Sequence, residues 1–261
     1  MSAPLSIIAR SCPLLALAAC GSVRQTPDDG PAADAWAASC APAAVVTIVE
    51  AADAGFGNAC IHGAWFLQAG NGTTVPTAPG RPDNTAPVVP TAIALGSNGL
   101  DPSSTFAVHV TGSGQQNVGT TFSYAQLTAS LNALTATQIG TVDATAYTGI
   151  QFYAIVVAGT AGVRFTVANL YTDPVGKLCT ATAGQPTSCF DHPGAKLTIT
   201  SVWTKYQIPF ASLTQIGFGN PSPLGAAFPR DAITLVKWDI GIPMSGPTEP
   251  WELWVDDLTF Y

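Results

Sequence analysis

Short runs of β-branched and aromatic residues recur along this 261-residue chain, separated by clusters of Gly, Pro, Asn and Asp. Such runs are typical of strands joined by turns. One segment, residues 123–134, has helical propensity and is predicted to form a turn or two of helix. The expected strands are 44–50, 105–112, 148–157, 162–172, 195–201, 205–210, 234–242 and 252–261. Eight or more strands without crossover helices predict an all-β fold of two packed antiparallel sheets.

Composition and net charge indicate which classes of binding partner to expect. Hydrophobic residues make up 47% of the chain and charged residues only 10%, so Thr, Ser, Asn and Gln must supply most of the surface polarity, as in many extracellular β-proteins. The net charge is −7, and the Lys and Arg residues are scattered. Nucleic acid is therefore not an expected partner, because binding a phosphate backbone requires clustered positive charge.

The N-terminal residues resemble an export signal. One charged residue, Arg10, precedes a short apolar run that ends at Cys20 and is too short to span a bilayer as a helix. The tetrad LAAC that ends at Cys20 is similar to the lipobox of bacterial lipoproteins, in which the cysteine is lipidated. We expect a signal peptide at 1–20, a flexible tether at 21–43 and one folded domain at 44–261.

This interpretation places the protein in the cell envelope, as an outer-membrane lipoprotein or at the cell surface, with the lipid as its only membrane contact. An ordinary signal peptide cleaved nearby and a misassigned start codon are the alternatives.

Four cysteines remain beyond the export signal, an even number that favours an oxidising compartment. The simplest pairing is local. Cys179 and Cys189 bracket a turn-rich segment, and Cys40 with Cys60 would tie down the start of the domain. A zinc site is the alternative, but paired CxxC or HExxH spacing is absent from the sequence.

Alternation in the strands at 148–157 and 162–172 separates an apolar face from a mixed one. The mixed face carries Gln151, Tyr153, Arg164 and Thr166. An amide, a ring and a guanidinium on one outer sheet face could hold a hydroxylated ligand, although a merely solvated face explains the same residues. Flat rings stack on sugars, and the rings considered for this role are Trp65, Tyr153, Trp238 and Trp251. We expect Trp203 and Trp254 to be packing residues instead.

Four segments resemble a known family. They are AYTGIQFYAI, CFDHPG, VWTKYQIPFASLTQIGFG and ELWVDDLTFY, in this order. Their order and spacing are similar to those of galactose-binding-like jelly-roll domains of the family 11 carbohydrate-binding module and complex I intermediate-associated protein types, as found in bacterial surface lipoproteins. The resemblance covers roughly residues 45–261 and implies a jelly roll that binds glycan or another envelope component without chemistry. The expected ligand-binding residues are Gln151, Tyr153, Arg164, Trp65, His192 and Trp238.

The resemblance also implies a structural Ca²⁺ site. In jelly rolls of this type an Asp pair near the last strand binds Ca²⁺ together with an acidic residue at the end of the first strand. Here the pair is Asp256 and Asp257, the acidic residue is Glu50, and Asp53 could add a ligand. The alternative places the two aspartates at a strand bulge that faces water or a lysine.

Two other functions stay open. A polysaccharide lyase or glycosidase built on the jelly roll could use Asp191 and His192 together with Tyr153 and Arg164, although a loop histidine between Asp and Pro is more often structural. The second open function is that of a noncatalytic surface protein, which would use its faces for protein contact. No residue is assigned a catalytic role.

Replacement of Cys20 by Ser should release the protein into the soluble fraction, because the acyl chains are the expected membrane contact. Fractionation and mass spectrometry of the mature N-terminus would test this. Continued membrane association of a wild-type chain that carries no lipid would contradict it.

Overall fold

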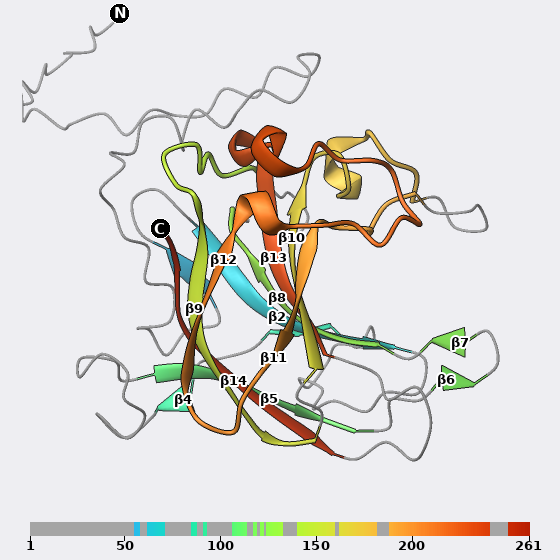
Figure 1. Ribbon diagram of the computed structural model, residues 1–261. Coiled ribbons are helices and arrows are strands. Elements are labelled where there is room, and N and C mark those ends of the chain that lie inside the picture. Colours follow the sequence, from blue (N-terminus) through green and yellow to red (C-terminus); the bar gives the residue numbers. More distant parts are fainter. Residues whose placement is uncertain are drawn as a thin grey trace, which may run out of the picture.

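The computed structural model describes residues 55–57, 62–70, 85–87, 91–92, 106–113, 117–118, 121–122, 124–132, 140–159, 162–181, 188–240 and 250–261. Their strands form two antiparallel sheets and a small ribbon (Figure 1). One sheet has seven described strands, in the order β1-β2-β8-β13-β10-β11, with β3 also paired to β2. The other has five, in the order β12-β9-β14-β5-β4. This arrangement is an all-β, two-sheet antiparallel jelly-roll sandwich, as the sequence predicts.

The seven-stranded sheet contains β1 (Gly55–Gly57), β2 (His62–Gly70), β3 (Thr85–Pro87), β8 (Tyr124–Ser130), β10 (Gly162–Asn169), β11 (Gly194–Thr198) and β13 (Ile233–Ile240). The five-stranded sheet contains β4 (Thr91–Ala92), β5 (Phe106–Gly112), β9 (Gly149–Ala158), β12 (Thr204–Pro209) and β14 (Trp251–Phe260). The ribbon pairs β6 (Asn117–Val118) with β7 (Thr121–Phe122). Seven of the eight expected strands are confirmed within a few residues, and residues 44–50 lie outside the described residues.

Aromatic rings join the two sheets. Phe152 on β9 packs against Phe165 on β10 with ring centroids 5.0 Å apart, and against Trp238 on β13 at 5.1 Å. All three side chains are fully buried. Because successive strand residues point to opposite faces, the neighbours of these rings point away from the core.

The chain changes sheets between β9 and β10. These strands are adjacent in sequence, yet β9 pairs with β12 and β14, whereas β10 pairs with β11 and β13. The crossing begins at Gly159, where φ is +81° and a Cβ would lie 2.6 Å from the carbonyl oxygen of Pro250. Only glycine fits this conformation and this close approach. The prediction that Gln151 and Tyr153 share a face with Arg164 and Thr166 is therefore wrong.

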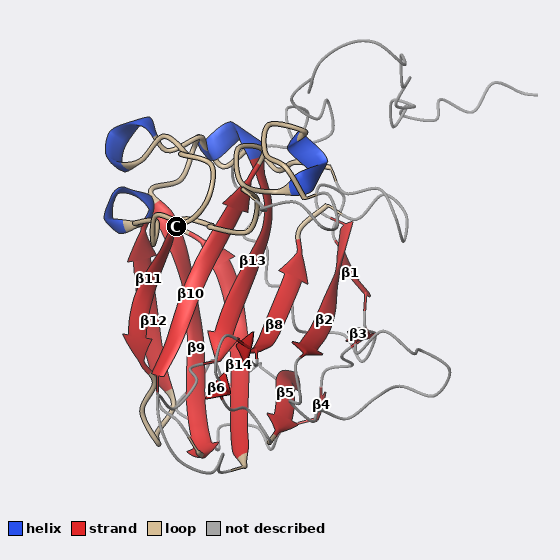
Figure 2. Cartoon of the chain, turned by 90° about the vertical axis from the view of Figure 1, so that its right-hand side faces the viewer, coloured by secondary structure: helices blue, strands red, loops and turns tan. Residues whose placement is uncertain are grey.

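The segment predicted to be helical, residues 123–134, is also corrected. Residues 124–130 form β8, which lies between β2 and β13 in the seven-stranded sheet, where tertiary pairing overrides the local helical propensity. The described helices are short 3₁₀ turns at one end of the sandwich (Figure 2): η1 (Pro174–Gly176), η2 (Phe210–Ser212), η3 (Gly225–Ala227) and η4 (Arg230–Ala232). None of the described helices is long and apolar enough to cross a membrane.

Candidate ligand-binding site

A group of charged and polar side chains lies on the outer face of the seven-stranded sheet, where β8, β13 and β10 run side by side (Figure 2). In β13 the ring of Trp238 points into the core, so Lys237 and Asp239 take the outer face. Lys237 lies directly opposite Thr128 on one neighbouring strand and Thr166 on the other. These side chains are close enough across the strands to act on one ligand.

The next row across the same three strands is also polar. Asp239 lies opposite Gln126 on β8 and Arg164 on β10. Burial raises the pKa of the Asp239 carboxyl, and the charges of Lys237 and Arg164 and a hydrogen bond from Gln126 oppose that shift. The two rows together place two cations and one carboxylate on the same face.

Lys237 is the most unusual member of this group. Its side chain is only 7% exposed, and within the part of the chain that the structure describes its ammonium makes no hydrogen bond and no ion pair. The nearest aromatic contact is Phe190, whose ring centroid lies 5.8 Å from Nζ. Burial lowers the pKa of Lys237, and the more distant charges of Asp239 and Asp173 partly oppose that shift.

Unpaired polar atoms gather around this lysine. Eight buried side-chain nitrogen or oxygen atoms of the described residues lack a hydrogen-bond partner, and four belong to this group: Thr128 Oγ1, Thr166 Oγ1, Asp239 Oδ1 and His192 Nε2. An unsatisfied buried polar atom costs about 1–3 kcal/mol. Folded proteins rarely leave several together unless a ligand or ordered water completes them, so this group has the character of a binding site.

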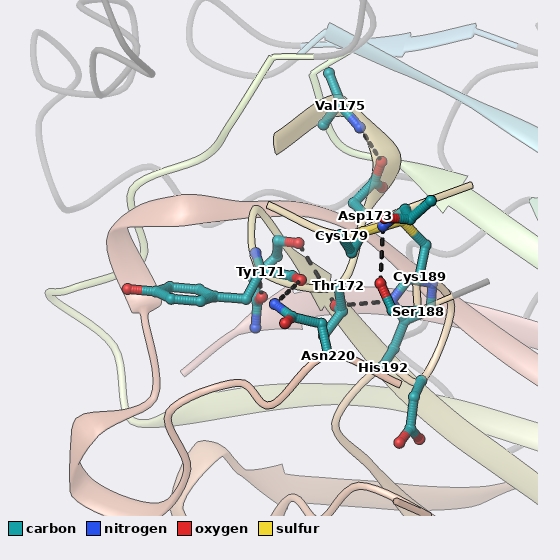
Figure 3. The surroundings of a disulfide bond; sticks show 12 residues. Tyr171, Thr172, Asp173, Val175, Cys179, Ser188, Cys189, His192 and Asn220 are labelled. Atoms are coloured by element: carbon teal, nitrogen blue, oxygen red, sulfur yellow. Dashed lines mark hydrogen bonds between the residues drawn. A yellow bond between two sulfur atoms is a disulfide. The ribbon is translucent and has the colours of Figure 1, made fainter. Parts of the chain in front are cut away.

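His192 enters the group from the loop before β11. Its Nδ1 lies 2.9 Å from Thr172 Oγ1, a contact visible in Figure 3, and Nε2 has no partner. Burial, together with the positive charges of Lys237 and Arg164, holds the pKa of His192 well below 6.5, so the ring is neutral at pH 7. Arg164 Nη2 donates to the carbonyl oxygens of His192 and Thr214, which ties this loop to β10.

Two anchors hold the loop that carries Phe190 and His192. The first is the predicted disulfide between Cys179 and Cys189, which is confirmed (Figure 3). The second is the buried carboxylate of Asp191, which accepts hydrogen bonds from three backbone N–H groups, those of Ile216 (2.9 Å), Gly217 (2.7 Å) and Gly219 (3.1 Å). Between the anchors, Phe190 has φ +76° and is 48% exposed, so its ring borders the site from the solvent side.

The structure brings together some of the predicted ligand-binding residues and separates others. Arg164 and His192 lie in the group described above, but His192 is buried and offers only Nε2. Trp65 and Trp238 are 0% exposed and pack on each other at 5.6 Å, so the prediction that their rings face a ligand is wrong. Their strand positions point inward, where rings fill the space between the sheets.

Gln151 and Tyr153 lie on the outer face of the five-stranded sheet, away from Arg164. On that face Gln207 Nε2 donates to Gln151 Oε1 at 2.9 Å. The group proposed for a lyase or glycosidase is consequently not assembled, because Tyr153 is on the opposite side of the sandwich and Asp191 is occupied by backbone donors.

The burial of the other tryptophans differs from the expectation. Trp251, considered as a sugar-stacking ring, is buried, whereas Trp203 and Trp254, expected to be packing residues, are partly exposed. Trp254 stacks on His109 with centroids 3.8 Å apart, and both donate toward Glu252 Oε1, at 2.9 and 3.0 Å. Trp254 is opposite His109 on β5, on the outer face, and only the pairing of the strands reveals this.

The residues expected to bind Ca²⁺ are described only in part. Asp256 is fully buried, and its Oδ1 accepts a hydrogen bond from the backbone N–H of Asp257 at 2.8 Å. Asp257 has φ +49°, and the strand register shifts after Asp256, so the pair does lie at a β-bulge. Glu50 and Asp53 lie outside the described residues. No group of three or more potential metal ligands occurs among the residues that are described.

Other predictions concern residues outside the described ranges. These are Cys20 as the lipidation site, the tether, and the pairing of Cys40 with Cys60. They stay predictions.

Sequence reasoning missed Lys237, Asp239, Thr128 and Phe190. One usable signal was present in β13, where the residues Lys237 and Asp239 flank Trp238. If the tryptophan points inward, both charges must point outward. No local signal indicated that Thr128 would face them, because residues 123–134 were expected to be helical.

No protein-family model and no curated protein matches this chain. Among solved structures, the family 11 carbohydrate-binding module of a cellulosomal cellulase of Clostridium thermocellum is 18% identical with a TM-score of 0.43, covering 75% of this chain and 86% of that one. The Clostridium thermocellum module in complex with a β-1,3-1,4-mixed-linked tetrasaccharide is 19% identical with a TM-score of 0.46, covering 84% and 96%. Likenesses this low do not indicate a shared ligand.

The neutral, buried state of His192 predicts a pH-dependent stability. Below pH 6.5 an unfolded histidine binds a proton that the folded one does not, so the free energy of unfolding should fall as pH drops below 6.5. A single group contributes at most about 1.4 kcal/mol per pH unit. His192→Asn, which can keep a hydrogen bond to Thr172, should show a flatter profile in urea unfolding between pH 5 and 8. Identical profiles for the two proteins would contradict the neutral histidine.

Proposed function

We propose that this chain is a noncatalytic carbohydrate-binding domain of an exported, lipid-anchored protein, and that glycan binds on the outer face of the seven-stranded sheet. The observation that carries the proposal is the group of unpaired buried polar atoms around Lys237. Such atoms need hydrogen-bond partners, and a sugar ring presents several hydroxyl groups that both donate and accept.

The chemistry of the group suits a saccharide. Thr128 and Thr166 offer hydroxyls, Asp239 offers an acceptor and Lys237 offers donors, all on one face. The exposed ring of Phe190 beside them can pack on the apolar face of a sugar. A few polar groups that fix orientation next to an aromatic surface are what small-ligand sites require.

The arrangement of the carboxylates favours binding without chemistry over hydrolysis of the glycan. Glycosidases use two carboxyl groups on either side of the glycosidic bond. In this group Asp239 is the described carboxylate with an unpaired oxygen, whereas Asp191 and Asp173 accept hydrogen bonds from backbone or threonine donors. An enzyme would therefore need an acid from elsewhere.

We also propose that Ca²⁺ binds Asp256 and Asp257 together with Glu50. The described residues fit this ion in part: the two aspartates are consecutive at the bulge, and carboxylates are ligands that Ca²⁺ accepts. The ion would supply positive charge and tie the last strand to the start of the domain.

A glycan panel with matched variants tests the binding face. Phe190→Ala should weaken binding about tenfold, or ~1.4 kcal/mol, because it removes the ring that packs on the sugar. Tyr153→Ala removes a ring from the opposite sheet and should leave the affinity unchanged. Titration calorimetry or affinity electrophoresis gives the comparison. A loss of affinity with Tyr153→Ala alone would move the site to the other face, and cleavage of the glycan would favour the enzyme.

Chelation tests the calcium proposal. A ligand that binds only the folded state at a hundredfold excess over Kd stabilises by about 2.7 kcal/mol, so removing Ca²⁺ with EGTA should lower the melting temperature by several degrees. The double variant Asp256→Asn with Asp257→Asn should lose that response, whereas Asp231→Asn, an exposed control in η4, should keep it. An unchanged melting curve of the wild-type protein under EGTA would refute the site.

A further inference from the structure

We propose that the saccharide bound at this site carries an oxyanion, a carboxylate or a sulfate, that pairs with Lys237. The inference rests on the proposed glycan-binding function and names the class of sugar. The feature that favours an acidic sugar unit over a neutral one is the Lys237 ammonium, which has no ion pair among the described residues.

The basic groups of the site are not paired with its carboxylates. Lys237 and Arg164 are the basic groups of the two rows, Asp239 is the carboxylate among them, and Asp191 and Asp173 act on Arg164 and Lys237 from nearby. None of these carboxylates forms an ion pair with Lys237 among the described residues. An unpaired lysine is notable in a chain with only 9 Lys and Arg residues against 16 Asp and Glu residues.

Nearby carboxylates do not neutralise Lys237. Asp239 and Asp173 both oppose the lowering of the Lys237 pKa, but in the described residues neither carboxylate lies within 4.0 Å of the ammonium to form an ion pair. Asp173 accepts hydrogen bonds from Val175 N and Thr234 Oγ1, at 3.0 and 2.9 Å. Lys237 as a residue is thus only 7% exposed, and its ammonium has no carboxylate within 4.0 Å among the described residues.

A neutral hydroxyl group would satisfy the hydrogen bonds of this ammonium but not its charge. Burying an unpaired charge is far more costly than burying a dipole, and the cost is recovered when an anion with good hydrogen bonds takes the partner position. The hydroxyls of Thr128 and Thr166 lie on either side of Lys237 and can both donate to an oxyanion. The positive charge of Lys237 and the two hydroxyl donors beside it are therefore placed to bind the same oxyanion.

Arg164 supports the anion from a distance. Its Nη2 is engaged with the carbonyl oxygens of His192 and Thr214, so this part of its guanidinium holds the loop in place. It adds positive potential without being the direct partner. Lys237 is accordingly the residue that should discriminate acidic from neutral sugars.

The experiment compares each acidic polymer with its neutral form. The full protein is titrated with polygalacturonate and alginate, each beside its carboxyl-reduced form, and with dextran sulfate beside dextran. We expect at least one acidic polymer to bind tenfold or more tightly than its neutral form, with affinity falling as salt is raised. Binding of polygalacturonate or alginate would indicate a carboxylate as the oxyanion, and binding of dextran sulfate would indicate a sulfate.

Variants then locate the effect. Lys237→Met should abolish the preference for the acidic form, while Lys205→Met, an exposed lysine on β12 of the other sheet, should keep it. Removing an unpaired buried charge should not lower the melting temperature. If Lys237→Met fails to fold, Lys237→Gln serves the same comparison with a polar side chain of similar length.

The outcomes separate this inference from the proposed function. Equal binding of the acidic and neutral forms, unchanged by Lys237→Met, would overturn the acidic-sugar inference and leave glycan binding intact. An acidic preference that survives Lys237→Met and Lys237→Gln would also overturn it. Failure of every polymer, neutral and acidic, in a wider glycan panel would refute the proposed function itself.

Discussion

The rings of Phe152, Phe165 and Trp238 pack between the two sheets and set the orientation of the strands that carry them. These rings come from three strands and two sheets, and their centroids lie 5.0 to 5.1 Å apart. Burying large rings supplies much of the hydrophobic free energy of a β-sandwich. Because side chains alternate along a strand, fixing these rings inside also fixes which residues face outward.

The outward residues on β13 and β10 are those of the candidate site. Once Trp238 is inside, Lys237 and Asp239 must lie outside, and once Phe165 is inside, Arg164 and Thr166 must. The sheet is then partly covered by the loop held through the disulfide and Asp191, which leaves Lys237 buried. Burying an uncompensated lysine opposes folding, and the core offsets that cost.

The two outer faces of the sandwich differ in chemistry. On the outer face of the five-stranded sheet Gln207 bonds Gln151, and His109 and Trp254 both bond Glu252, although the buried Thr259 Oγ1 opposite Gln151 has no partner. On the seven-stranded sheet several polar atoms are left without partners. This contrast, rather than the presence of aromatic or polar residues alone, distinguishes the candidate site from a solvated face.

Local sequence patterns predict the all-β class, the bounds of most strands, the alternation within them and the disulfide between Cys179 and Cys189. Each of these depends on neighbours within about a dozen residues. Tertiary structure alone decided that β9 and β10 belong to different sheets, that β8 is a strand, and which tryptophans are exposed. The physical reason is that strand alternation is a property of the local backbone, whereas sheet membership depends on pairing between residues far apart in the chain. The site around Lys237 is built from such pairings, so its residues could be read from the sequence only as separate charges.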